Sequence, residues 1–175
     1  LLPPLLARLE ALGLPPAAIT LLIATGAHAP LAAEEFKRVL PAAIMARYPV
    51  RSHDCDDEAN LCYLGQTQRG TPVWMNRHFV EAELRLVVGN VEPHQFQGFS
   101  GGAKSAAIGL GGRVTINTNH ALLRDPRARP CGYADNPMRQ DVEEIGELAG
   151  IHFALNAVLT PEKALAHVIA GAPHA

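Results

Sequence analysis

The stretch from Glu92 to His120 combines side chains that can carry out chemistry with a loop that can approach a ligand closely. His94 stands near its start, Lys104 follows ten positions later, and His120 closes it sixteen positions after the lysine. An amine between two imidazoles offers a nucleophile, proton carriers and metal ligands within one segment. We therefore expect this stretch to form the floor of a cofactor site.

The loop that leads to Lys104 is rich in small residues. Glycine lets backbone amides come close to anionic or planar ligands, because no Cβ stands in the way. The residues that we expect to bind the cofactor in this way are Gly98, Ser100, Gly101 and Gly102.

Lys104 is one of three lysines beside twelve arginines, so guanidinium groups carry most of the positive charge. An amine can lose its proton and form covalent bonds, which a guanidinium cannot. Two other roles stay open, a point charge that binds phosphate and an exposed surface lysine. Residues 98–105 nearly match the phosphate-loop pattern G-x-x-x-x-G-K-[ST], but Ala103 replaces the second glycine and residues 93–97 separate the loop from the preceding strand.

His28 follows a continuous apolar run at 19–24 and the turn Thr25-Gly26. In open α/β sheets ligands bind at the carboxyl ends of strands, which is where His28 would stand. The alternative is a histidine that caps the following helix or binds a loop carbonyl.

His53 lies in the sequence HDCDD, where carboxylates and a thiol suggest a metal site. Hard carboxylate and soft thiolate ligands in consecutive positions do not easily converge on one ion, so a solvated turn is the favoured interpretation. The remaining histidines carry no local signal; they are His78, His152, His167 and His174.

Hydrophobic periodicity predicts an α/β fold, with a mixed but mainly parallel sheet flanked by helices and a few antiparallel additions, in a Rossmann-like three-layer arrangement. Helices are expected at 5–12, 31–40, 76–81 and 138–150. Strands are expected at 19–24, 48–52, 61–64, 73–75, 84–88, 151–159 and 164–169. Residues 126–137, with three prolines, are expected to be irregular.

Composition excludes several classes of function. The 175 residues suit one domain, and a hydrophobic content of 48% supports a core. A net charge of −2 with scattered basic residues argues against nucleic acid or an anionic membrane as a partner. Neither a membrane span nor a secretory signal is visible. Three cysteines without C-x-x-C spacing argue against a disulfide framework, so we expect a cytoplasmic protein.

Several motifs resemble those of the nickel-dependent lactate racemase family and occur in the same order. They are IATGAHAPL, HDCDD, RGTPVWMN, PHQFQGFSGGAKS and TINTNH, followed by Asn136-Pro137, an acidic helix and FALNAVL. The resemblance covers nearly all of the chain. Enzymes of this family use a nickel pincer nucleotide, pyridinium-3-thioamide-5-thiocarboxylic acid mononucleotide, in which nickel sits between two sulfurs and the pyridinium C4.

The resemblance implies a racemase or epimerase of small, lactate-like 2-hydroxy acids that works by reversible hydride transfer to this cofactor. It assigns the thioamide tether to Lys104, the nickel ligand to His120, and the acid–base pair on opposite faces of the substrate to His28 and His94. Imidazole pKa values near neutrality suit proton transfer in both directions, and imidazole is a natural nickel ligand.

The chain also departs from the family pattern. Ala29 stands where the family often has arginine, and Ala103 occupies a position that can be arginine. The upstream motif that binds the substrate carboxylate and the downstream domain that completes the cleft are not in this sequence. We therefore expect residues 1–175 to be the central part of the N-terminal catalytic domain, without the C-terminal domain, and to be inactive alone.

A second class of function stays open, a non-catalytic module that binds phosphate, a nucleotide or a metal through residues 98–105. A covalent adduct on Lys104 with one nickel per chain would favour the racemase. Binding of ordinary nucleotides that is lost in Lys104→Ala, without nickel, would favour the module. Loading with the pincer cofactor depends on separate maturation enzymes.

Overall fold

Short helices and strands alternate along the chain. The computed structural model describes residues 1–173, so His174 lies outside the described part. The helices are α1 (Leu2–Ala11), α2 (Ala42–Met45), α3 (Arg77–Val80), α4 (Lys104–Ala107), α5 (Arg113–Ala121) and α6 (Pro137–Ala149). The strands are β1 (Leu21–Ile23), β2 (Val50–Ser52), β3 (Leu61–Gln66), β4 (Pro72–Asn76), β5 (Leu86–Asn90), β6 (Pro93–His94), β7 (Gly98–Phe99), β8 (Phe153–Leu159) and β9 (Leu165–Gly171). Turns of 3₁₀ helix occupy Pro16–Ala18, Ala33–Arg38, Glu58–Asn60 and Leu122–Arg124.

Within residues 1–173 the strands form four small sheets rather than one. β1 and β2 pair in parallel, β3 and β4 pair antiparallel, and β6 and β7 form a two-stranded ribbon. The largest sheet has the order β5-β8-β9, with β5 parallel and β9 antiparallel to β8. The fold is therefore mixed α/β, and the prediction of a mainly parallel, Rossmann-like three-layer sheet is wrong.

Short connections explain the difference from the predicted sheet. A parallel pair needs a long crossover, whereas an antiparallel pair needs only a tight turn. Gly70, with a φ of 81°, lets β3 turn back onto β4. Lys163, with a φ of 64°, lies in the turn from β8 to β9, where Thr160 N donates to Ala164 O over 2.8 Å. Strands that are close in the sequence therefore pair with each other through tight turns, which leaves fewer strands to form a parallel sheet.

Helix α6 confirms the helix predicted at 138–150, and its ends show why it forms. The Asn136 side chain caps the first turn by accepting hydrogen bonds from Met138 N (3.0 Å) and Arg139 N (3.2 Å). Gly150 ends the helix with a φ of 65°, in the left-handed region that suits glycine. Both end signals are local, so the sequence alone could indicate them.

Several other helical segments differ from the prediction, and the short helices α2 and α4 were not predicted. The helix predicted at 31–40 is the 3₁₀ turn Ala33–Arg38, and α5 was not predicted at all. The α5 sequence is rich in threonine and asparagine, which have weak helix propensity. Contacts with distant residues stabilise it instead: the buried Thr115 Oγ1 donates to Pro72 O over 2.8 Å and accepts from Trp74 N, also at 2.8 Å.

One face of α6 forms the centre of the main core. Val142, Ile145 and Ala149 recur at helical spacing and are buried. They pack with apolar side chains from other parts of the fold, namely Val73, Met75, Phe79, Val87, Ala103, Ala106, Ala107, Leu110, Ile151 and Ala154. Gly146 lets α4 approach closely, because a Cβ there would lie 2.7 Å from the Ala103 Cβ. The core thus fixes α4, and with it Lys104, against α6.

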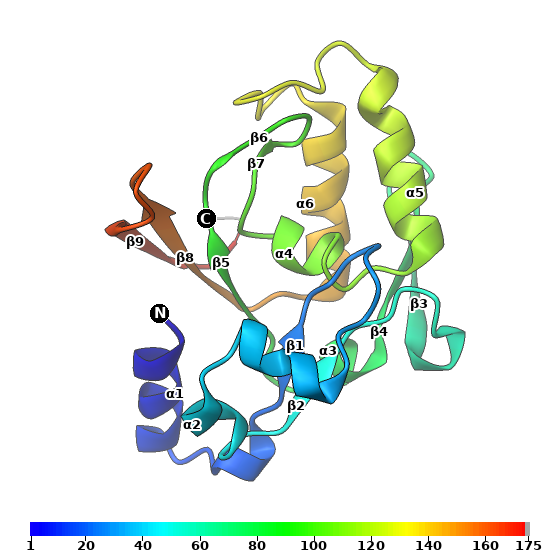
Figure 1. Ribbon diagram of the computed structural model, residues 1–175. Helices are drawn as coiled ribbons and strands as arrows, with labels where there is room; N and C mark the ends of the chain where they lie inside the picture. The colour runs from blue at the N-terminus through cyan, green and yellow to red at the C-terminus, as the bar shows by residue number, and fades with distance from the viewer. Residues whose placement is uncertain (174–175) are drawn as a thin grey trace.

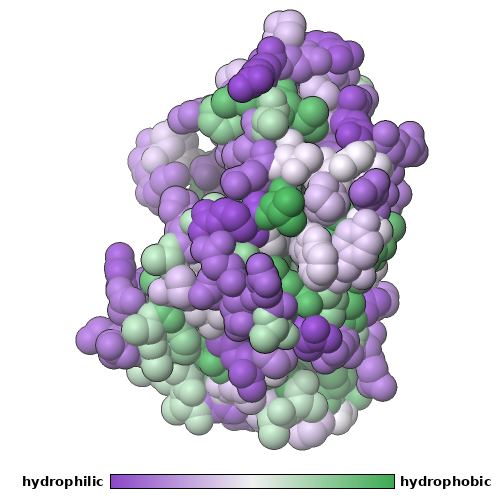
Figure 2. Space-filling model, turned by 90° about the vertical axis from the view of Figure 1, so that its right-hand side faces the viewer, coloured by the Kyte–Doolittle hydropathy of each residue, from purple (hydrophilic) through white to green (hydrophobic). Residues whose placement is uncertain are grey.

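The two ends of the molecule have separate clusters of elements. Figure 1 shows α1, α2, β1 and β2 at the lower end, where a smaller apolar cluster joins Leu6, Ile19, Ile44 and Tyr48. Helices α5 and α6 and the ribbon β6–β7 lie at the upper end (Figure 1). Hydrophilic and hydrophobic residues are interspersed on the face drawn in Figure 2. No helix in the described part of the chain has the length and apolar character needed to cross a bilayer.

Ile145→Ala is expected to lower the free energy of unfolding by about 2–5 kcal/mol, because this buried side chain would leave a cavity in the core. Leu148→Ala is the matched control on the same helix: Leu148 is 40% exposed, so its loss should cost about 1 kcal/mol or less. Urea unfolding followed by circular dichroism measures both changes. Equal losses would contradict the burial of this face of α6.

Candidate functional site

His94 is carried on the ribbon that follows β5. The ribbon pairs His94 with Gly98. Ser100 closes its base, because the Ser100 Oγ donates to Asn90 O (2.8 Å) and accepts from Glu92 N (3.0 Å). The ribbon therefore holds His94 beyond the carboxyl end of β5, the edge of the sheet where ligands bind in open α/β folds.

Two side chains from other elements anchor the tip of the ribbon. The Asn136 Nδ2 donates to Phe96 O over 2.7 Å. Gln97 is fully buried, and its Nε2 donates to the Asn119 Oδ1 over 2.9 Å. A two-stranded ribbon of this length has little stability of its own, so these anchors determine where His94 lies.

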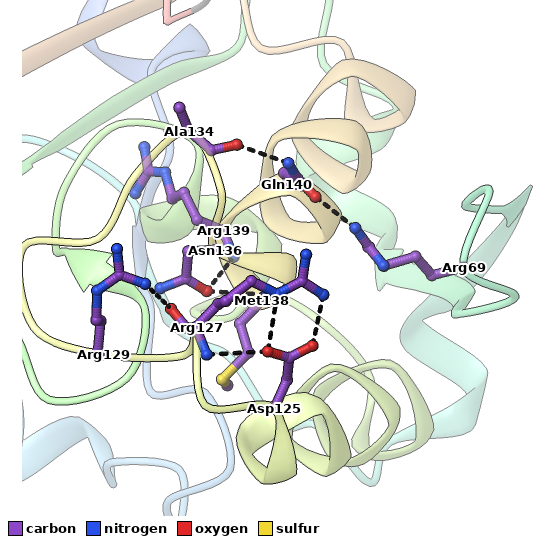
Figure 3. Close-up of polar contacts among 9 residues, drawn as sticks. All are labelled: Arg69, Asp125, Arg127, Arg129, Ala134, Asn136, Met138, Arg139 and Gln140. Carbon is purple, nitrogen blue, oxygen red and sulfur yellow. Dashed lines mark hydrogen bonds and ion pairs between the residues drawn. The ribbon is translucent and has the colours of Figure 1, made fainter.

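Asn136 is itself held by the hydrogen-bonded segment drawn in Figure 3. Asp125 Oδ1 accepts from both Arg127 N and Arg127 Nε at 2.9 Å, which folds the start of the segment back on itself (Figure 3). Nearer to α6, the Gln140 Nε2 donates to Ala134 O over 2.6 Å. Residues 126–137 are irregular, as predicted, yet these bonds fix their path.

The half-buried His94 imidazole accepts two backbone hydrogen bonds. Its Nδ1 lies 3.4 Å from the donor Phe96 N and 3.3 Å from the donor Gln97 N. A ring nitrogen that accepts carries no proton, so the proton of the neutral ring lies on Nε2. The ring of Phe96 packs edge-on against the imidazole, with 5.3 Å between centroids. His94 therefore presents an N–H group through Nε2.

Lys104 and His120, the two other candidates of the stretch 92–120, act electrostatically on His94. Burial lowers the pKa of His94, and electrostatic interactions with Lys104 and His120 lower it further, against the opposing charge of Glu92. His94 is therefore a neutral imidazole near pH 7. Hydrogen bonds connect the elements that carry these residues: Gln97 of the ribbon binds Asn119, which precedes His120, and Arg139, whose charge acts on Lys104, binds Phe99 O of the ribbon.

Lys104 is the half-buried first residue of α4. Burial lowers the pKa of its amine, and the charge of Arg139 lowers it further. Arg139 is buried, pairs with Glu143, and donates through Nη1 to Phe99 O over 3.2 Å. A lysine with a lowered pKa has a larger neutral fraction near pH 7, and the neutral amine is the nucleophilic form.

His120 lies in the last turn of α5, half-buried, and has the opposite tautomer from His94. Its Nδ1 lies 2.8 Å from Ile116 O, so Nδ1 carries the proton and donates it to this carbonyl. A lone pair is left on Nε2. Metal-binding histidines usually donate their other ring N–H in this way, which fixes the ring and raises its basicity.

A buried polar network connects the helix of His120 with the rest of the fold. The Asp141 carboxylate is fully buried and accepts three hydrogen bonds: from Thr67 Oγ1 (2.6 Å), Thr71 Oγ1 (3.0 Å) and Asn119 Nδ2 (2.9 Å). Asn119 precedes His120 on α5 and also receives the hydrogen bond from Gln97. The network therefore links the β3–β4 turn, α6, α5 and the ribbon.

The buried polar residues that hold the site together were not predicted from the sequence: Gln97, Asn119, Arg139 and Asp141. The one available signal was position, because Gln97 lies inside PHQFQGFSGGAKS and Asn119 inside TINTNH. A single sequence does not show that these polar side chains are buried.

The glycines of the loop have different surroundings. A Cβ at Gly98 would lie 1.8 Å from Gly132 O, and a Cβ at Gly101 would lie 2.7 Å from the Asn156 Oδ1. Glycine is therefore needed at both positions for the loop to adopt this fold. A Cβ at Gly102 would make only an ordinary contact, so Gly102 has space beside its Cα. Its N–H donates to the Asn156 Oδ1 over 3.2 Å.

The geometry does not favour a phosphate-binding loop here. The ribbon stands between β5 and the glycines, whereas a phosphate loop follows its strand directly. Helix α4 has only four residues, which gives a weak helix dipole. Ala103 is fully buried against Gly146, so the position that replaces the second glycine serves packing.

His28 lies in the turn after β1, as predicted, and it is exposed. Gly26 N donates to Gly109 O over 3.0 Å, so the turn contacts the connection between α4 and α5. The His28 imidazole makes no side-chain hydrogen bond within residues 1–173. It is also absent from the charges that act on His94. No hydrogen bond within residues 1–173 links His28 with His94, Lys104 or His120, and the roles of all four residues stay predictions.

The prediction that the sequence HDCDD forms a solvated turn is wrong for His53. His53 is fully buried, its Nε2 donates to Gly111 O (2.9 Å), and its Nδ1 accepts from the Asn76 Nδ2 (3.1 Å). Burial lowers its pKa, which favours the neutral ring. Both ring nitrogens have protein partners, so His53 is a core residue that joins β4 to the loop before α5.

The three following residues converge, contrary to expectation. Ligand atoms of Asp54, Cys55 and Asp56 lie within 4.8 Å of one another. However, Asp56 pairs with Arg113, and burial raises the pKa of the Cys55 thiol, which keeps it protonated. The Asp56 carboxylate is thus already engaged by a guanidinium, and the buried Cys55 thiol would have to lose its proton to bind a metal.

Comparison with known proteins finds similarity to lactate racemases. Residues 1–130 match the family described as lactate racemase N-terminal domain. The lactate racemase of Lactiplantibacillus plantarum is 32% identical over 171 residues, which cover 97% of this chain and 40% of that enzyme. The lactate racemase of Thermoanaerobacterium thermosaccharolyticum is 31% identical over 155 residues, which cover 87% of this chain and 36% of that enzyme. The chain thus spans about two fifths of the length of these curated relatives.

Solved structures resemble the chain as well. The structure of the lactate racemase apoprotein from Thermoanaerobacterium thermosaccharolyticum has a TM-score of 0.86 and 30% identity, and the match covers 89% of this chain and 38% of that one. The crystal structure of a protein from Thermotoga maritima has a TM-score of 0.71 and 24% identity, with 87% and 42% covered. The second likeness concerns the fold alone.

The lowered pKa of Lys104 predicts a pH dependence of stability. Between that pKa and the ordinary value of 10.5, the unfolded chain holds a proton that the folded chain has released. The free energy of unfolding should therefore rise with pH in this window. Lys104→Met should remove this part of the rise, whereas Lys37→Met, at an exposed lysine, should keep it. Urea unfolding at several pH values up to about 10.5 measures the slope, and equal slopes in wild type and Lys104→Met would refute the prediction.

Proposed function

The chain belongs to the family of lactate racemase N-terminal domains, and from this membership we propose that it carries the catalytic half of a racemase or epimerase of small 2-hydroxy acids. The observation that carries the proposal is the group formed by His94, Lys104 and His120. All three are half-buried, and the hydrogen bond from Gln97 to Asn119 holds the ribbon of His94 against the helix of His120. Their spacing matches the family pattern of proton carrier, cofactor tether and metal ligand.

The residues present fit a nickel pincer nucleotide as the cofactor. His120 has a lone pair on Nε2, because its Nδ1 proton is donated to Ile116 O, and a neutral imidazole nitrogen is a suitable nickel ligand. The Lys104 amine, with its lowered pKa, suits a covalent thioamide link. When bound, this cofactor supplies a carbon that accepts and returns the hydride of the substrate C2.

We assign the proton steps to His94 and His28. Racemisation requires the C2 hydrogen to leave one face and return to the other, while the hydroxyl proton leaves and returns with it. In its neutral form His94 presents its Nε2–H as a hydrogen-bond donor to the substrate oxygen, since backbone N–H groups occupy Nδ1. To transfer a proton from Nε2, the ring must first be an imidazolium, and the neutral ring that remains then keeps its proton on Nδ1. His28 has no side-chain partner within residues 1–173, so it is available to accept a proton on the other face.

We propose that groups outside this chain complete the cleft, with residues 1–175 as the central part of the N-terminal catalytic domain. The matched relatives extend well beyond the part that they share with this chain, which supports the proposal. The group that binds the substrate carboxylate would come from there. Which 2-hydroxy acid is the substrate then depends on that other wall of the cleft.

Co-expression with the enzymes that make the cofactor is expected to give a covalent adduct on Lys104 and one nickel per chain. Intact-mass spectrometry and elemental analysis measure the two. Lys104→Arg should abolish the adduct, Lys163→Arg should keep it as the exposed control, and His120→Ala should keep the adduct but lose most of the nickel. Binding of ordinary nucleotides that is lost in Lys104→Ala, with no adduct and no nickel, would instead support the non-catalytic module.

The loaded chain by itself is expected not to interconvert the two enantiomers of lactate, because the residues that bind the substrate carboxylate are proposed to lie elsewhere. Chiral chromatography of lactate incubated with the loaded chain measures this. Measurable racemisation by residues 1–175 alone would contradict the proposed division of the cleft.

A further inference from the structure

The sheet β5-β8-β9 has one face toward the core and an opposite, outer face. Successive side chains of a strand point to opposite faces, and paired residues share a face. Val87 and Ala154 pair with each other and lie in the main core with α4 and α6. The alternate positions form the outer face, which includes Val88, Phe153, Leu155, Leu159, Leu165 and Val168.

The outer face is apolar on all three strands and exposed on the two outer ones. Val88 of β5 is 40% exposed, and Leu165 and Val168 of β9 are 57% and 50% exposed. Val88 pairs with Leu155, so the patch continues from strand to strand. None of the six side chains belongs to either apolar cluster of the described residues. Figure 1 shows β8 and β9 at the left-hand margin of the molecule, with α4 and α6 to their right. A continuous exposed apolar patch marks an interaction surface, whereas singly scattered apolar residues do not.

The strand sequences are typical of a sheet that is covered on both faces. They read LVVGN, FALNAVL and LAHVIAG, without a single charged side chain. A sheet with one face in water alternates apolar and polar residues, whereas strands that are buried on both faces are apolar almost throughout. The edge strand β9 also lacks the lysine or proline that commonly protects a free edge from pairing.

We propose that an apolar surface of the parent enzyme, from outside residues 1–175, packs on this outer face. The chain matches 40% of one lactate racemase and 36% of another, so more than half of each relative lies outside the match. Strands β5 and β8 are parallel, and sheets with parallel strands are normally covered on both faces by elements of their own chain. A second copy of the chain is therefore the less favoured occupant.

The docked surface would lie next to the candidate site. The parallel strands β5 and β8 have their carboxyl ends at the same edge of the sheet. The ribbon with His94 follows β5 at this edge, and Asn156 of β8 accepts a hydrogen bond from Gly102 N over 3.2 Å, two residues before Lys104. Packing on the outer face thus brings the rest of the enzyme to this edge from the side opposite α4 and α6. This meaning rests on the proposed function, in which groups outside the chain complete the cleft.

Cysteine labelling at residue 168 tests the docking. Val168→Cys is introduced into the 175-residue chain and into the longer chain that contains it, and its reaction with N-ethylmaleimide is followed by peptide mass spectrometry. The rate should be lower in the longer chain by roughly tenfold or more, because a covered side chain reacts only when the interface opens. Glu162→Cys is the matched control: it lies exposed in the turn before β9 and should react at similar rates in both chains.

Equal labelling rates of residue 168 in the two chains would overturn the proposal. Protection that disappears on dilution, together with a dimer in sedimentation experiments, would also overturn it, because a second copy would then be the occupant. If Val168→Cys does not fold, Val88→Cys takes its place on β5 under the same criteria. The labelling needs no cofactor, so a failure to find nickel or an adduct on Lys104 would refute the proposed function and leave this result intact.

Discussion

The buried carboxylate of Asp141 is the constraint on which the upper half of the molecule depends. A charge removed from water must be satisfied by donors, and here two threonines of the β3–β4 turn and one asparagine of α5 supply them. The three elements therefore keep fixed positions around α6. Asn119 passes this constraint on to Gln97, and so to the ribbon that carries His94. The geometry of a site at the surface is thus set from inside the core.

The predictability of each element follows from where its stabilising interactions lie. Helix α6 could be predicted because its apolar face, its Asn136 cap and its terminal Gly150 all lie within one segment. Helix α5 could not, because weak helix formers such as Thr115 are held by hydrogen bonds to β4, about forty positions away. The strands near 84–88 and 151–159 were located, but their parallel pairing depends on a connection that runs through α4, α5 and α6. Local patterns do not specify such partners.

The candidate site shows the same division between local and distant information. Residue types and spacing were enough to single out His94, Lys104 and His120 as candidates, because their chemistry is a property of each side chain. The partners that tune them come from far along the chain: Gln97 and Asn119 are 22 positions apart, and Thr67 and Asp141 are 74 apart. The lowered pKa of Lys104 likewise depends on burial and on Arg139, neither of which the local sequence shows.

His120, His94 and His53 differ in how their two ring nitrogens are occupied, because the groups around each ring differ. His120 meets the second lone pair of a helical carbonyl four residues earlier, so its Nδ1 becomes a donor and Nε2 keeps a lone pair. His94 meets the unpaired N–H groups of a tight turn, so its Nδ1 becomes an acceptor and Nε2 keeps the proton. His53 has partners at both nitrogens and serves only the core. The secondary structure that holds each ring therefore decides whether its second nitrogen keeps a lone pair, keeps a proton or is occupied by a protein partner.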